Sequence, residues 1–143
     1  MAAMKRSIAA LLGAALLVSV SACGGGGGSA TTIRVEERDF DLTALKPSAK
    51  AGSLTLDIHN LGKIPHEVLI VRTDLDGSKL PLTAAGDTVD EKNSALTILG
   101  SQRNILPGAS ATLTADLKAG NYVLLCNISQ HYKQHMWQQF KIT

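Results

Sequence analysis

The sequence is poor in charge. Of its 143 residues, 18% are charged, and the formal net charge at pH 7 is only +2. Once Lys5 and Arg6 are set aside, the rest of the chain carries 12 basic and 12 acidic residues and is neutral. This balance, with 45% hydrophobic residues, excludes a highly charged disordered chain and a polybasic protein that binds nucleic acid.

Sulfur is also scarce, and its placement is uneven. The chain contains two cysteines, Cys23 and Cys126, and three methionines, two of which lie within the first four residues. Beyond residue 23, Cys126 and Met136 are therefore the only sulfur-containing side chains.

Residues 1–22 have the pattern of a lipoprotein signal peptide. Two basic residues precede an apolar run over residues 8–20, which is shorter than the about 20 residues that a membrane span needs. The segment ends in Val-Ser-Ala-Cys, which resembles the bacterial lipobox, where the cysteine, here Cys23, is lipidated and becomes the first mature residue. The alternative is an ordinary cleavage site followed by a chance cysteine.

Residues 23–30 contain five consecutive glycines and predict a flexible tether with no apolar surface to pack. No later segment is apolar enough over sufficient length to span a bilayer. We therefore expect an exported protein that is lipid-anchored to the outer face of the cytoplasmic membrane or in the periplasm.

Residues 31–143 predict one all-β domain. Apolar and polar residues alternate over residues 54–59 and 111–116, while residues 68–71 and 122–126 are continuously apolar, as in strands covered on both faces. Glycine-rich turns separate these runs, which favours an antiparallel Greek-key β-sandwich. Tyr122, just after a tight turn, resembles a tyrosine corner. Residues 73–102 predict a long polar connection, with a short helix around residues 87–96 as one interpretation.

The chemistry is concentrated after the last continuous apolar run. Cys126, His131 and Met136 follow one another with the spacing Cys-x4-His-x4-Met. A thiolate, an imidazole and a thioether form a soft ligand set that suits copper. Because a strand rises about 3.3 Å per residue, this segment must fold back as a loop for its side chains to reach one ion. His66, which opens another apolar run on its core-facing side, is the candidate fourth ligand.

Each of these residues also has a simpler interpretation. A lone cysteine is often a small buried hydrophobic residue, a lone methionine fills gaps in a core, and a lone histidine is usually a hydrogen-bonded polar residue. An unpaired thiol in an exported protein is, however, prone to oxidation, and metal ligation would explain its presence.

Residues 60–68 (NLGKIPHEV) and 120–136 (GNYVLLCNISQHYKQHM) resemble the blue copper cupredoxins of the plastocyanin and azurin type. The resemblance covers the chain from about residue 31, is specific only at these two segments, and implies an eight-stranded sandwich that binds one type 1 copper ion. It implies a trigonal plane formed by His66, Cys126 and His131, with Met136 as the weak axial ligand. His131 would be the exposed ligand through which electrons enter and leave.

Three positions depart from the pattern of many cupredoxins. Ser129-Gln130 stands where many have Pro-Gly, His135 where many have glycine before the methionine, and Glu67 where asparagine commonly follows the first histidine. We expect His135 to point outward, because neighbouring residues on an extended loop tend to point in opposite directions; the alternative is that it competes for the metal. Glu67 is either a buried hydrogen-bond partner of the loop or solvated at its rim.

Asn60 is a further candidate neighbour of the site, and His59 is interpreted as structural. The resulting hypothesis is a monomeric, membrane-anchored one-electron carrier that serves redox partner proteins in an extracytoplasmic chain. The alternative is a copper carrier or assembly factor that delivers copper to a membrane oxidase. An enzyme is disfavoured, because four protein ligands leave no open position on the metal and no nucleophile–base pair or phosphate-binding loop is evident.

Overall fold

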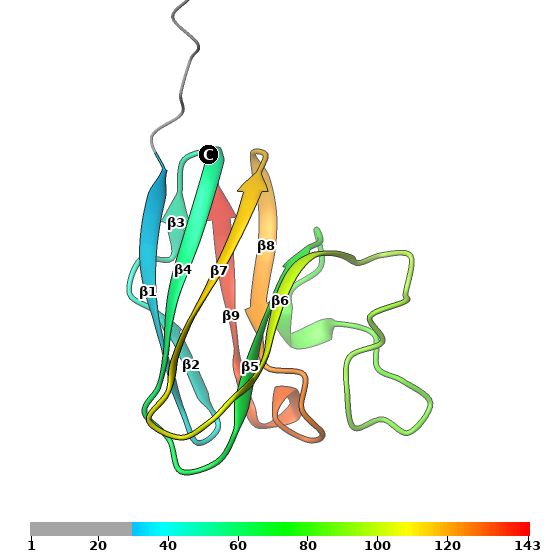
Figure 1. Ribbon diagram of the computed structural model, residues 1–143. Coiled ribbons are helices and arrows are strands. Elements are labelled where there is room, and N and C mark those ends of the chain that lie inside the picture. The colour runs from blue at the N-terminus through cyan, green and yellow to red at the C-terminus, as the bar shows by residue number, and fades with distance from the viewer. Residues whose placement is uncertain (1–29) are drawn as a thin grey trace, which may run out of the picture.

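A computed structural model describes residues 30–143 as two β-sheets packed face to face (Figure 1). The predicted signal peptide, Cys23 and the tether as far as residue 29 lie outside the described residues. Within residues 30–143, no helix combines the length and the apolar character needed to cross a membrane.

One sheet has the strand order β2-β1-β4-β7 and the other has the order β3-β9-β8-β5-β6. The strands are β1 Thr31–Arg38, β2 Asp41–Ala44, β3 Ser48–Ala49, β4 Gly52–Asn60, β5 His66–Arg72, β6 Thr97–Ile105, β7 Ser110–Leu117, β8 Gly120–Leu125 and β9 Trp137–Ile142. Two 3-10 turns, η1 Gly77–Lys79 and η2 Tyr132–Gln134, lie in loops.

The predicted β-sandwich is confirmed, with two differences in detail. β1 pairs with β4, and β3 with β9, in parallel rather than antiparallel fashion. The described residues form nine strands rather than eight. β2 and β3 have only four and two residues, which is at or below the shortest run over which alternation can be recognised in a sequence.

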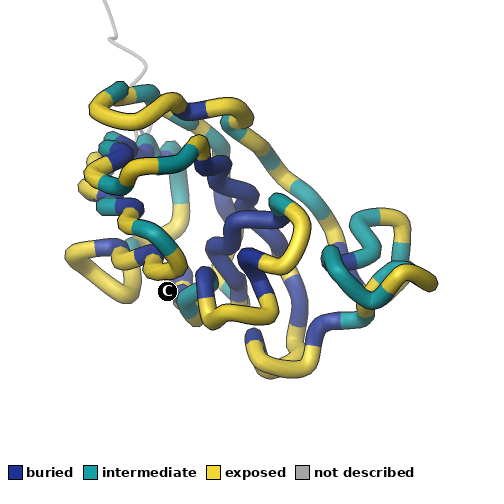
Figure 2. Tube along the Cα trace, turned by 90° about the horizontal axis from the view of Figure 1, so that it is seen from below, coloured by how far each residue is buried: buried dark blue, intermediate teal, exposed yellow. Residues whose placement is uncertain are grey.

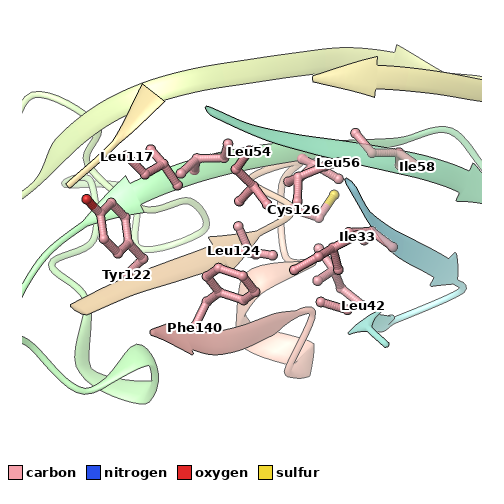
Figure 3. Packing of buried hydrophobic residues seen from close by; sticks show 14 of the residues in the cluster. Ile33, Leu42, Leu54, Leu56, Ile58, Leu117, Tyr122, Leu124, Cys126 and Phe140 are labelled. Carbon is pink, nitrogen blue, oxygen red and sulfur yellow. The ribbon is translucent and has the colours of Figure 1, made fainter. Parts of the chain in front are cut away.

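The main core lies between the two sheets and is built from alternate residues of their strands. Leu54, Leu56 and Ile58 of β4 point inward, as their spacing predicts, and all three are almost fully buried. Figure 3 shows Tyr122 near one end of this core and Cys126 towards the other, close to Leu56.

A second apolar cluster covers the outer face of β5 and β8. It contains Leu69, Val71, Leu80, Val89, Leu96, Val123, Leu125 and Tyr132. The covering residues come largely from the long loop over residues 73–96, which lies beside β5 and β6 in Figure 1. The continuously apolar character of β5 and β8 therefore has the predicted cause, because both strands are buried on both faces.

The connection after β5 differs from the sequence prediction. It ends at residue 96, because residues 97–105 form β6, and residues 87–96 form turns instead of a helix. Asp90 and Asn93 each accept a hydrogen bond from the backbone N–H two residues further on. Such side-chain bonds compete with the hydrogen bonds of a helix and favour turns.

Tyr122 forms the predicted tyrosine corner. Its hydroxyl donates a hydrogen bond of 2.7 Å to the carbonyl oxygen of Lys118, across the tight turn between β7 and β8. The ring is fully buried. This contact fixes the start of β8, the strand that leads directly to Cys126.

Candidate metal centre

Three of the four predicted ligands come together at one end of the sandwich. β5 begins at His66 and its antiparallel neighbour β8 ends just before Cys126, so both reach the end that lies opposite the C-terminus in Figure 1. The potential ligand atoms of His66, Cys126 and His131 all lie within 4.8 Å of one another. Cys126 Sγ is 3.3 Å from His131 Nδ1, and the two imidazole centroids are 5.2 Å apart.

The loop that follows Cys126 folds back as the ligand spacing requires. The Met136 N–H donates to the carbonyl oxygen of His131, and the Cys126 N–H donates to the carbonyl oxygen of Met136. Met136 is fully buried and belongs to the main core together with Cys126. The backbone therefore brings Met136 beside Cys126, although these two residues are ten positions apart in the sequence.

Asn60 holds the turn that leads to His66. Its amide nitrogen donates to the carbonyl oxygens of Ile64 and Ile105, both at 2.8 Å, and its side-chain oxygen accepts from the Gly62 N–H at 2.9 Å. A side chain at Gly62 would collide with the carboxylate of Asp39 and the ring of His66. Asn60 thus acts on the site through the backbone.

A residue that sequence reasoning missed lies beside the ring of His66. Asp39 Oδ1 accepts a hydrogen bond of 2.7 Å from the Lys63 N–H and lies 3.5 Å from His66 Nε2. Neither nitrogen of the buried His66 ring has a hydrogen-bond partner, and Nδ1 lacks even the longer contact that Nε2 makes with Asp39. Because an unpaired polar atom is costly to bury, this nitrogen fits a metal ligand.

Burial tunes the protonation of the cluster. It raises the pKa of the Cys126 thiol to about 12, partly opposed by backbone N–H groups of Ile128 and Glu67 that point at the sulfur. Burial also lowers the pKa of His66 and of His131, and for His66 the nearby His131 adds to the effect. At neutral pH and without metal, the centre therefore holds a neutral thiol and neutral imidazoles, and a bound metal ion would displace the thiol proton.

The ligand loop is held from outside by the loop over residues 73–96. Asn127, next to Cys126, exchanges two hydrogen bonds with the backbone of Val89, at 2.7 and 3.0 Å. The carbonyl oxygen and carboxylate of Asp87 accept hydrogen bonds from residues 130 and 129, respectively. The Tyr132 hydroxyl donates to the carbonyl oxygen of Gly77 at 2.6 Å. Figure 2, viewed towards this end, shows buried segments enclosed by exposed loops.

His131 is less exposed than the resemblance implied. Only 7% of it is accessible, and the ring of Phe40 meets it edge-on with centroids 5.4 Å apart. Phe40 lies in the turn between β1 and β2 and is itself 42% exposed. The accessible edge of the centre therefore includes a phenylalanine. The sequence offered one signal for it, a large aromatic residue within a charged turn.

Glu67 is buried rather than solvated at the rim, but the partner of its carboxylate is not the ligand loop. Its carboxylate pairs with Arg103 at 2.8 Å instead of bonding to the ligand loop. His59 hydrogen-bonds Asp57 and Ser110 on the neighbouring strand positions, which agrees with a structural role.

Glu37 is a second buried acid that sequence reasoning missed. It continues the inward-facing alternation of Ile33 and Val35 on β1, which was the available signal. The residue is fully buried, and neither carboxylate oxygen has a hydrogen-bond partner. Burial, with a smaller contribution from Glu67, raises its pKa to about 8.

His135 points outward, as predicted, and is exposed beside the buried Met136. Its φ is 69°, and that of Gln130 is 70°. Both occupy left-handed backbone positions, which glycine adopts most easily. The glycine that many cupredoxins have at these two places would fit this backbone without strain.

We expect His135→Gly to stabilise the metal-free domain by about 0.5 kcal/mol, since it relieves the left-handed strain but makes the unfolded chain more flexible. Chemical denaturation measures this gain. Lys133→Gly is the control and should destabilise the domain, because residue 133 has no positive φ to relieve. The Cu(II) absorption should stay nearly unchanged in His135→Gly. A large spectral change there, with little change in Met136→Leu, would show that His135 is a ligand.

Comparisons with known proteins identify one matching family. A family model described as the sulfocyanin (SoxE) domain matches residues 45–143. Comparison with curated protein sequences found no significant match. The family-model match is to the sequence and covers more than half of the chain, so the family assignment does not depend on the fold alone.

Solved structures share the fold at low sequence identity. An auracyanin from Roseiflexus castenholzii matches with a TM-score of 0.59 and 22% identity, over 81% of this chain and 99% of its own. Auracyanin A from Chloroflexus aurantiacus, described as a "blue" copper protein, matches with a TM-score of 0.56 and 17% identity, over 80% of this chain and 99% of its own. Rusticyanin from Thiobacillus ferrooxidans matches with a TM-score of 0.58 and 16% identity, over 81% of this chain and 79% of its own. The predicted cupredoxin fold is thereby confirmed, and the chain belongs to the sulfocyanin (SoxE) domain family.

Proposed function

We propose that the protein is a membrane-anchored electron carrier that holds one type 1 copper ion and serves an extracytoplasmic redox chain. His66, Cys126 and His131 would hold the ion, with Met136 as the fourth ligand. The observation that carries the proposal is the convergence of two imidazoles and one thiol at a buried point where His66 Nδ1 has no other partner. When bound, copper supplies the exchange of a single electron.

The surrounding residues favour electron transfer over catalysis. Asp39 and the Asn60 turn hold the first histidine, while the loop over residues 73–96 holds the segment after Cys126. Ligands fixed in this way need little movement when the charge of the ion changes. The donor side chains are buried, so the site offers little room for a substrate. The ring of Phe40 against His131 provides a short route to the surface.

The test is repeated reduction and oxidation of the copper-loaded domain, followed by visible absorption. We expect an intense thiolate-to-copper band that disappears and returns through many cycles without loss of metal. Ready release of Cu(I) to a chelator during the cycles would contradict an electron carrier and favour a protein that delivers copper.

The anchor has its own prediction, motivated by the Val-Ser-Ala-Cys pattern. Cys23→Ser removes the only candidate acceptor for lipid in this pattern, so the protein should move from the membrane to the soluble exported fraction. Cell fractionation and immunoblotting measure the shift. Ser29→Ala, which changes the tether but keeps the cysteine, should remain in the membrane fraction. Persistent membrane association of Cys23→Ser would contradict the lipid anchor.

A further inference from the structure

Arg103 of β6 connects two residues that are direct sequence neighbours of predicted ligands. Its Nη1 lies 2.8 Å from Glu67 Oε2, and its Nη2 contacts both carboxylate oxygens of Glu91, at 3.0 and 2.8 Å. Glu91 Oε1 also accepts a hydrogen bond of 2.9 Å from Asn127 Nδ2. The chain of contacts thus runs from the residue after His66 to the residue after Cys126.

The backbone beside Arg103 is irregular at this point. β5 and β6 pair His66 with Ile105 and then Val68 with Gln102, so one residue of β5 lies opposite two of β6. This is a β-bulge, a feature that redirects side chains and leaves ladder positions unpaired. Asn104, within the bulge, has a φ of 56°. Glu67 is the β5 residue opposite the bulge. The backbone N–H of Glu67 is directed at the sulfur of Cys126.

We propose that Arg103 is a positioning residue of the metal centre, which holds the bulge at Glu67 and the loop at Asn127 in one fixed arrangement around Cys126. This inference rests on the proposed copper function. Arg103 touches none of the predicted ligands and acts through their neighbours.

Loss of Arg103 should disturb the local structure even though its side chain is partly exposed. Exposed ion pairs usually contribute little, and the Arg103 side chain is 47% exposed. The Glu67 side chain, however, is only 7% exposed, and Arg103 is its charged partner. Removing the guanidinium would leave a buried carboxylate unpaired, which is much costlier than losing a surface contact. The expected response is a rearrangement of the bulge and therefore of the N–H that faces Cys126.

The experiment compares Arg103→Gln and Arg103→Lys with Arg34→Gln. Arg34 is a matched control, because its side chain is 43% exposed and pairs with Glu36 away from the bulge. In the metal-free domain, we expect Arg103→Gln to speed hydrogen exchange at the Val89 amide, which donates to Asn127, by about tenfold. In the Cu(II)-loaded domain, we expect a shift of the thiolate-to-copper band. After chemical reduction of the same sample with dithionite, we expect about tenfold faster loss of Cu(I) to a chelator.

The lysine variant tests whether the site needs a guanidinium that contacts two carboxylates or only a positive charge. Lysine keeps the positive charge but has no planar fork with which to hold two carboxylates at once. We therefore expect Arg103→Lys to resemble Arg103→Gln, and full rescue by lysine would overturn the proposal. If Arg103→Gln fails to fold, Glu91→Gln tests the same link, because it weakens the pairing with Arg103 and leaves Glu67 paired.

The two hypotheses fail in different ways. Unchanged exchange, absorption and copper release in Arg103→Gln would overturn the role of Arg103 while leaving the copper site intact. Absence of the absorption band from the unsubstituted protein would overturn the copper function instead. In that case, hydrogen exchange in the metal-free domain would still decide whether Arg103 holds the two segments together.

Discussion

Glu37→Gln should make the metal-free domain markedly more stable at pH 8 and leave its stability nearly unchanged at pH 4.5. The pKa of Glu37 is raised from 4.5 to about 8 in the folded state. The folded protein therefore binds this proton more tightly than the unfolded chain does. The protonated Glu37 side chain therefore contributes its full stability to the fold below pH 4.5. As the pH rises towards 8, the free energy of unfolding falls by up to about 4 kcal/mol, at 1.4 kcal/mol per pH unit.

The glutamine variant removes this loss, because an amide does not ionise and has nearly the same volume. Chemical denaturation of both proteins at pH 4.5 and pH 8 measures the difference in their free energies of unfolding at each pH. Groups other than Glu37 titrate in both proteins, so their contributions cancel in this difference. Glu36→Gln is the control, since Glu36 is a partly exposed neighbour that pairs with surface arginines. Equal effects of Glu37→Gln at the two pH values would show that the Glu37 carboxylate is solvated in the folded domain.

Cys126→Ser should abolish the visible charge-transfer band of the copper-loaded domain while leaving the sandwich folded. The band requires a thiolate bound to copper, and serine supplies no sulfur. Replacing a fully buried thiol with a hydroxyl should cost about 1–3 kcal/mol of stability, a small part of what the core contributes. Visible absorption with Cu(II) and circular dichroism of the metal-free protein measure the two effects separately.

Proton release provides a second readout for the same change. Because the thiol of Cys126 has a pKa of about 12, copper uptake at neutral pH should release about one proton from the unsubstituted protein. The serine variant should release none, while Cys23→Ser replaces a cysteine that is not among the predicted ligands and should behave like the unsubstituted protein. Unfolding of metal-free Cys126→Ser would instead mark Cys126 as mainly a packing residue.

Local patterns in the sequence were sufficient to predict β4, β5, β7 and β8 and the ligand segment, but not β6 or the short strands β2 and β3. Period-two alternation predicted which residues of β4 face the core, and continuous apolar runs predicted that β5 and β8 are covered on both faces. The spacing of Cys126, His131 and Met136 predicted a loop that folds back. These features depend on neighbours within a few positions, so they can be read without knowing the fold.

The residues that orient the centre were decided by tertiary structure alone. Asp39 meets the turn before His66 across 24 positions, Arg103 meets Glu67 across 36, and Tyr132 meets the loop at Gly77 across 55. A polar side chain in a loop carries no periodic signal that identifies a distant partner. The sequence therefore determined which atoms are available to bind a metal, and the packing of the two sheets and the long loop decided how those atoms are held, because hydrogen bonds between loops exist only after the strands have brought them together.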